Sequence, residues 1–275
     1  MGANVKGLRV RIRSVNSTLH LTKAMGLVAS SKIRRAQVSM NASGEYRDVV
    51  AGMINQLTQS AECLSSPFMK SVDNPKRLMI VIAGDRGLAG GYNNNIFRLV
   101  AQYPDVRVIG IGKRAADRYS DGEGYLSAED FSLDDCIALA KRLRQEFLEG
   151  KFQELDIVCT HYQNMLTQTA EIRQLLPLVR PEDDEEKAGV GTLFEPDSLT
   201  VLNAAVEEYL SGMIYGCVRE SYACEVASRR TAMDSASKNA QEMIDNLSLE
   251  YNRARQGAIT QEITEIVAGA NETDA

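Results

Sequence analysis

The chain has 275 residues, with 31 lysines and arginines against 37 acidic residues, a formal net charge of −6 and 44% apolar residues. No 18-residue stretch is both apolar and uncharged, so the composition excludes a membrane-spanning helix. Five cysteines without a C-x-x-C pair and two widely separated histidines predict buried, reduced thiols and no metal site.

The N-terminal stretch is basic and helical in pattern. Its first 44 residues hold eight lysines or arginines, and the first acidic residue is Glu45. The first proline is Pro67, so we expect one helix over about residues 4–60, roughly 85 Å long. Apolar residues recur at helical spacing at Leu8, Ile12, Val15, Leu19, Met25, Val28, Ile33, Ala36 and Met40, and the first four of them follow coiled-coil spacing.

The middle of the chain, residues 76–195, predicts an α/β domain. Ser132 and Asp135 resemble a capping box at the start of one of its helices. The acidic run at residues 182–186 is interpreted as a solvated loop in preference to a metal site. The expected strands are residues 78–83, 106–111, 155–160 and 169–176, and the expected helices are 94–102, 113–119 and 132–148.

A glycine-rich loop, GDRGLAGGY at residues 84–92, follows the first expected strand. It lacks the lysine and hydroxyl residue that close a P-loop, and its glycine spacing does not fit the dinucleotide fingerprint. Asp85 would also place a negative charge beside a phosphate. We therefore predict a turn that binds no nucleotide, and no cofactor for the chain. A nucleotide-dependent α/β enzyme remains an alternative interpretation.

The C-terminal stretch mirrors the N-terminal one. The last proline is Pro196, and Asp197 and Ser198 can cap a helix that continues to about residue 268, roughly 105 Å. Such helices do not fit inside a compact protein of this length, whose radius of gyration would be about 19 Å. We predict an antiparallel coiled coil of the two ends, with domains at 1–62, 76–195 and 197–270. Its C-terminal seam is expected at Val206, Leu210, Met213, Cys217, Cys224, Met243, Leu247, Tyr251, Ile259, Ile263 and Ile266.

The basic N-terminal helix also suits a coiled-coil protein that binds nucleic acid, which is a second alternative. Positive charge by itself marks only the electrostatic footprint of such a protein. No aromatic side chains are interleaved with the basic ones, and no base-reading motif is present. We therefore expect no nucleic-acid partner.

Three stretches resemble the gamma subunit of rotary F-type ATP synthases. They are TKAMGLVASSKIRRAQ at 22–37, GDRGLAGGYN at 84–93, and RRTAMDSASKNAQEMIDNLSLEYNRARQGAITQEITEIVAGA at 229–270. The resemblance implies a coiled coil of the terminal helices plus a central Rossmann-like α/β domain, a mixed α+β and α/β architecture. Two positions depart from the family pattern: Ala89 stands where many members carry cysteine, and Gly26 where a longer side chain is usual.

The resemblance also implies a function. Such a subunit is a rotor shaft inside a ring of three alpha and three beta subunits, with its foot beside the epsilon subunit on a membrane ring of c subunits. It couples ion flow to ATP synthesis or hydrolysis and has no catalytic residue of its own. The implied position is peripheral, without membrane insertion. The absence of a transit sequence favours the cytoplasmic face of a bacterial plasma membrane.

Matching positions carry over as expected contact residues. Contacts with beta are expected at Lys23, Met25, Arg86, Arg229, Arg255 and Gln256. An apolar bearing tip is expected at Ile259, Ile263, Ile266 and Val267. A foot facing the c ring and epsilon is expected at Ser43, Gly44, Phe194 and Glu195.

Overall fold

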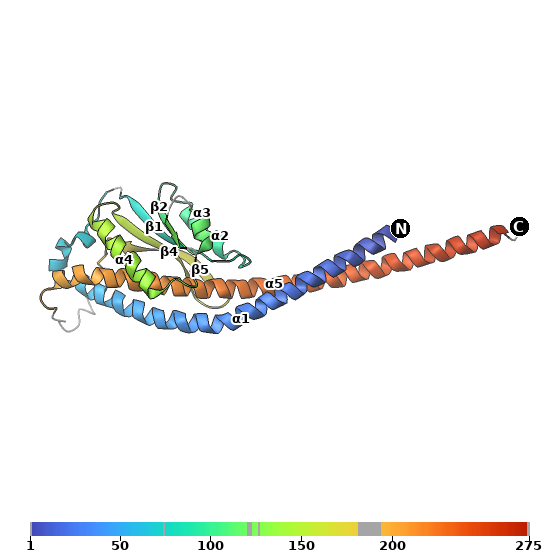
Figure 1. The fold of residues 1–275 in the computed structure, drawn as a ribbon, viewed down its shortest axis with the longest axis horizontal. Coiled ribbons are helices and arrows are strands. Elements are labelled where there is room, and N and C mark those ends of the chain that lie inside the picture. Colours follow the sequence, from blue (N-terminus) through green and yellow to red (C-terminus); the bar gives the residue numbers. More distant parts are fainter. Residues whose placement is uncertain (1, 74, 120–122, 126, 181–193, 274–275) are drawn as a thin grey trace. The chain divides into compact units, whose positions relative to one another are not determined.

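A computed structural model describes residues 2–73, 75–119, 123–125, 127–180 and 194–273. The acidic run at 182–186 lies outside the described residues. The chain divides into two compact units, one of Met1–Val28 with Arg230–Ala275 and one of Ala29–Arg229. The two long helices α1 (Gly2–Thr58) and α5 (Ser198–Thr273) contribute to both units (Figure 1). The predicted fold class is confirmed, whereas the predicted domain boundaries remain predictions.

The larger unit contains a five-stranded sheet in the order β3-β2-β1-β4-β5. The first four strands are parallel, and β5 runs antiparallel to β4. All four predicted strands are confirmed, but the short strand β3 was missed because its three residues carry no apolar run. The strands are β1 (Arg77–Ile82), β2 (Arg107–Ile111), β3 (Glu123–Tyr125), β4 (Glu154–Tyr162) and β5 (Gln168–Leu176).

Helices connect the parallel strands. They are α2 (Tyr92–Val100), α3 (Lys113–Arg118) and α4 (Leu133–Leu148), and two 3-10 turns, η1 (Ala61–Ser65) and η2 (Pro67–Met69), follow α1. The predicted capping box is confirmed, since the Ser132 hydroxyl accepts from the Asp135 N–H and the Asp135 carboxylate accepts from the Ser132 N–H. The predicted cap of α5 is also confirmed: Asp197 Oδ1 accepts from the Thr200 N–H at 2.8 Å.

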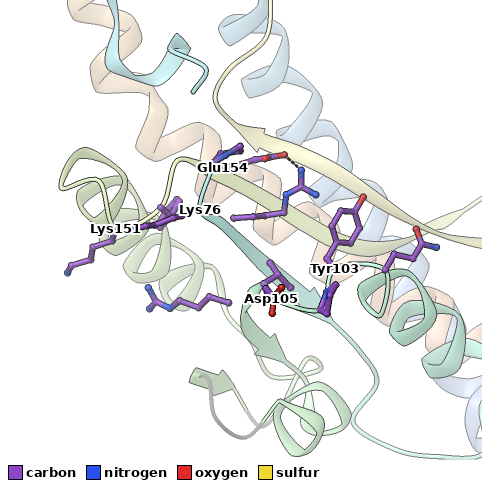
Figure 2. A pocket seen from close by; sticks show the side chains of 12 residues that line it. Lys76, Tyr103, Asp105, Lys151 and Glu154 are labelled. Atoms are coloured by element: carbon purple, nitrogen blue, oxygen red, sulfur yellow. Dashed lines mark hydrogen bonds and ion pairs between the residues drawn. The ribbon is translucent and has the colours of Figure 1, made fainter. Parts of the chain in front are cut away.

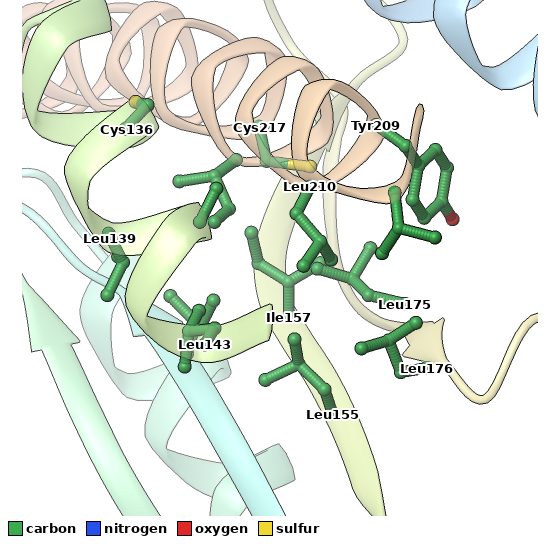
Figure 3. Packing of buried hydrophobic residues seen from close by; sticks show 14 of the residues in the cluster. Cys136, Leu139, Leu143, Leu155, Ile157, Leu175, Leu176, Tyr209, Leu210 and Cys217 are labelled. Carbon is green, nitrogen blue, oxygen red and sulfur yellow. The ribbon is translucent and has the colours of Figure 1, made fainter. Parts of the chain in front are cut away.

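Both faces of the sheet are covered, because alternate residues of a strand point to opposite sides. On β1, Leu78, Ile80 and Ile82 join a core with α4, α5 and the end of α1. Met79 and Val81 join a second core with α2 and α3. Figure 3 shows α4, β4, β5 and α5 meeting in the first core. All five cysteines are buried, as predicted.

The smaller unit is a two-helix antiparallel coil. The Ser237 hydroxyl donates to Thr22 Oγ1 at 2.8 Å, and Arg9 Nη2 donates to the Tyr251 hydroxyl at 2.7 Å. As residue numbers increase along α1, the numbers of their partners on α5 decrease. This confirms the predicted antiparallel pairing in this unit. Its buried residues include Leu19, Met233, Ala240 and Leu247.

Five positions expected on the apolar face of the coil are wrong. Val28 is 54% exposed and Met243 is 44% exposed, and Ile259, Ile263 and Ile266, which were expected on the seam as well as at the tip, are 43%, 56% and 71% exposed. On α1 the buried row passes through Gly26 and Ala29, and on α5 it passes through Ala240 and Leu247. Val28 and Met243 each lie one residue from this row, which includes Ala29 and Ile244, and one residue turns the side chain by about 100° around a helix. The three isoleucines lie on α5 past the level at which α1 begins.

Candidate functional site

The glycine-rich loop at residues 84–92 lies directly on α5. Gly84 leaves no room for a side chain, because an added Cβ would lie 2.7 Å from the Glu225 Cδ. Glu225 belongs to α5 and is only 2% exposed. The glycine is therefore required for close approach between the loop and a buried carboxylate. Sequence reasoning missed Glu225, because nothing near it in the chain indicates this contact.

The loop's polar groups bind groups of the same chain. The Gly84 N–H donates to Asn93 Oδ1 at 2.9 Å, and the Arg86 N–H donates to Glu225 Oε1 at 3.4 Å. The Asp85 carboxylate accepts from three backbone amides, those of Lys113, Ala128 and Glu129, at 3.2, 2.7 and 3.0 Å. Side-chain oxygens of Asn93 and Glu225 thus occupy loop donors that a phosphate would need, which supports a structural turn over a nucleotide site.

Arg229 binds its own chain. Its guanidinium pairs with Glu225 and donates to the carbonyl oxygens of Gly87 and Arg86, both at 3.3 Å. The Arg229 side chain is 13% exposed, whereas Arg86 is exposed. The structure therefore brings two of the expected contact residues together, and it leaves Arg86 as the one whose side chain faces outward.

The expected contact residues of the smaller unit lie on its two helices. Lys23, Arg255 and Gln256 are exposed, and Met25 is half-buried. Gly26 is buried, and an added Cβ there would lie 3.2 Å from Arg230 Nη1. The departure from the family pattern thus sits where the two helices approach each other.

The expected bearing tip extends beyond α1. Gly2 precedes Arg9 by seven residues, so the start of α1 is level with about residue 258 of α5. The four tip side chains follow that point on α5 and are 43–71% exposed: Ile259, Ile263, Ile266 and Val267. These four large apolar side chains have no partner among the described residues of α1, and they form a surface suited to an apolar environment.

The expected foot residues differ in accessibility. Ser43 is 3% exposed, and its hydroxyl donates to the Met40 carbonyl oxygen at 3.0 Å. Gly44 is half-buried, Phe194 packs against the larger core, and Glu195 is exposed. Glu195 is therefore the foot residue best placed to meet a partner directly.

A hollow of about 610 Å³ lies at the amino ends of β1, β2 and β4 (Figure 2). Three of its cations are paired: Arg77 Nη2 lies 2.5 Å from Glu154 Oε1, Arg107 Nη1 lies 3.0 Å from Glu146 Oε2, and Lys151 Nζ lies 2.9 Å from Glu149 Oε2. Ligands of open α/β sheets bind at the carboxyl ends of the strands. Its location and charge balance therefore give no reason to assign it a ligand.

A buried carboxyl lies beneath that hollow. Burial raises the pKa of Asp156 from 3.8 to about 6, although the Arg77 charge opposes the shift. Asp156 Oδ2 is 3.4 Å from Arg77 Nε, and the Asp156 side chain is 3% exposed. The group is structural, since it lies inside the sheet and away from the expected contact surfaces.

No helix within the described part of the chain has the length and apolar character needed to cross a bilayer.

Comparison with known proteins shows the family to which this sequence belongs. The profile of a family described as ATP synthase matches residues 4–272. The ATP synthase gamma chain of Ruminococcus albus is 39% identical over 278 residues, covering 96% of each chain.

Solved structures agree in fold. A chain of the Euglena gracilis mitochondrial ATP synthase OSCP/F1/c-ring, rotational state 3, superposes with a TM-score of 0.68 at 18% identity, covering 99% of this chain and 95% of that one. A chain of the rotor of the same enzyme, rotational state 1, gives 0.64 at 19% identity, covering 94% and 100%. The profile and the sequence match together establish that the chain belongs to the gamma-chain family of ATP synthase.

Proposed function

We propose that this chain is the single shaft of an assembly with three alpha and three beta subunits, standing with an epsilon subunit on a c ring. In this role it transmits rotation between ion flow through the c ring and the catalytic sites on beta. The observation that carries the proposal is the antiparallel coil of the smaller unit, whose apolar tip extends beyond α1. A tip with exposed isoleucines suits an apolar sleeve within which a shaft can turn.

The surface groups suit distinct partners. The exposed side chains of Lys23, Arg86, Arg255 and Gln256 are available to acidic and polar loops on beta. Arg229 acts indirectly, by holding the glycine-rich loop on α5. Half-buried Met25 supports the coil from its inner side. For the foot, we propose that Gly44, Phe194 and Glu195 face the c ring and epsilon, with Ser43 supporting them from inside.

The proposed position is peripheral, on the cytoplasmic face of a bacterial plasma membrane. Neither nucleic acid nor direct insertion into the bilayer is part of the proposal. The basic character of the first helix is assigned to contacts with beta, whose acidic loops would supply the opposite charge.

Co-purification tests this role. A tagged chain expressed with its cognate alpha and beta subunits should yield a complex of 3:3:1 by native mass spectrometry, with ATPase activity that the chain alone lacks. Recovery of the tagged chain without alpha and beta would refute the proposal. Salt-sensitive retention of nucleic acid in their place would favour the nucleic-acid alternative.

The buried thiols allow a site-specific test. Because all five native cysteines are buried, a cysteine at exposed Gln256 can be labelled selectively with a photo-crosslinker. Illumination of the complex should attach the label to beta, with the unlabelled parent chain as the control. Attachment only within the chain itself would exclude Gln256 from the beta contact.

Calorimetry addresses the enzyme alternative. The purified chain should give no binding isotherm with Mg-ATP at micromolar concentrations, because the loop's Gly84 and Arg86 amides already donate to Asn93 and Glu225, and Asp85 accepts from the Ala128 amide. A stoichiometric isotherm would favour the nucleotide-dependent enzyme.

A further inference from the structure

Leu88, in the glycine-rich loop, has an unusual backbone conformation. Its φ is +62°, in the left-handed region that leucine adopts rarely, and its side chain is 62% exposed. Gly90, two residues later, has φ +59°, and glycine adopts this region without a steric penalty. A leucine at position 88 therefore carries backbone strain while most of its surface stays in water.

Contacts on both sides enforce this conformation. Before Leu88, the Gly87 carbonyl oxygen accepts from Arg229 Nε at 3.3 Å. After it, Ala89 is buried, and the Tyr92 hydroxyl donates to the Ser221 carbonyl oxygen at 2.9 Å. Strained residues persist where their surroundings determine them, and they gather at functional sites. The loop thus holds one aliphatic side chain outward at a cost to the fold.

The surroundings of Leu88 are positively charged. Arg86, Lys113 and Arg114 are exposed. Arg114 Nη2 would lie 3.1 Å from a Cβ at Gly87, which places it at the loop. The charge of Asp85 is taken up by backbone amides, and Glu129 is paired with Lys32 at 2.6 Å. An apolar side chain within a basic rim complements an apolar pocket with an acidic rim.

We propose that Leu88 is an apolar anchor that inserts into a pocket bordered by carboxylates on the beta subunit. This rests on the proposed function, which supplies the partner. Binding energy at interfaces concentrates in a few well-packed anchors surrounded by polar contacts. The constrained backbone at Leu88 holds the side chain in its outward position before binding. Little conformational entropy is therefore lost when the side chain binds.

Three substitutions test the anchor. Leu88→Gly removes the side chain and relieves the strain, so the purified chain should show a higher urea midpoint. The same variant should bind the alpha–beta ring about tenfold more weakly, with lower ATPase activity at limiting concentrations. Leu88→Met keeps an apolar side chain and should bind within about twofold of the parent. Leu166→Ala, at a leucine 79% exposed in the β4–β5 turn, is the matched control and should bind as the parent does.

The outcomes separate the two proposals. Leu88→Gly binding as tightly as the parent would overturn the anchor. A lower urea midpoint for Leu88→Gly would overturn the strain argument and the inference with it. Equal weakening by Leu166→Ala would show a general effect of exposed leucines and would also overturn it. If the parent chain itself does not bind alpha and beta, the proposed function fails and removes the partner on which the anchor depends.

Discussion

Replacing Arg229 with methionine should destabilise the larger unit, because it leaves the Glu225 carboxylate buried without its counter-charge. The two side chains are 13% and 3% exposed, so solvent cannot replace the lost partner. Removing one member of a buried pair costs about 3–5 kcal/mol. The Arg86 N–H still donates to Glu225, which favours the lower end, about 3 kcal/mol.

Urea unfolding of the purified chain, followed by circular dichroism, measures this loss. With a slope of about 2–3 kcal/mol per molar urea, the midpoint should fall by about 1–1.5 M. Glu225→Gln combined with Arg229→Met removes both charges together. This double variant should recover part of the loss, so that the two single effects do not add.

Whether the two single losses of unfolding free energy add decides whether Arg229 and Glu225 form the described ion pair. If the double variant loses the sum of the two single losses within about 0.5 kcal/mol, the residues act independently. A single Arg229→Met variant as stable as the parent would likewise show that Glu225 needs no counter-charge. Either result would refute the account of how the loop is held on α5.

Gly84→Ala should lower the unfolding free energy by about 1–3 kcal/mol, since its Cβ would overlap a buried carboxyl group. The control is Gly91→Ala, whose Cβ meets only side-chain atoms at 3.8 Å. Equal losses of unfolding free energy in the two variants would contradict the close approach at Gly84. Cysteines at Val15 and Ile244 should cross-link within one chain on oxidation, because the register of the coil places them level; a chain that stays reduced would contradict this register. Asp156 has a pKa raised to about 6, so its protonated form stabilises the fold below about pH 4, and this contribution is lost as pH rises through 6. In the parent chain the unfolding free energy should therefore decline by up to about 3 kcal/mol between those pH values, and Asp156→Asn should remove this decline. Parallel pH profiles of unfolding free energy for the variant and the parent would refute the raised pKa of Asp156.

The helical coil could be predicted from sequence because its pattern is local. Coiled-coil spacing over long proline-free stretches indicates helices wherever it occurs. Which residues are buried depends on the partner helix, whose register is not local. Val28 and Met243 were placed on the seam as large apolar residues, whereas the structure buries Gly26 and Ala240. Small residues give no strong apolar signal, although they permit close approach.

The candidate site was less accessible to sequence reasoning. Glycine spacing was enough to disfavour a nucleotide at the loop, and the match to a family supplied Arg86 and Arg229. The opposite orientations of these two arginines follow from Glu225, which lies far away in the sequence. The conformation of Leu88 was equally hidden, because a leucine gives no sign in sequence that its φ is positive.

The free end of α5 has a consequence for the chain before assembly. A helical segment of some fifteen residues without tertiary packing is marginal in water. Past the level of Gly2, the end of α5 has no packing partner among the described residues of α1, and its isoleucines are exposed. In the free chain its amide hydrogens should exchange close to the rate of an unfolded peptide, while those near Leu247 stay protected. Partner subunits that surround the tip would then stabilise its helix. Part of the rigidity of the tip would therefore come from the assembly.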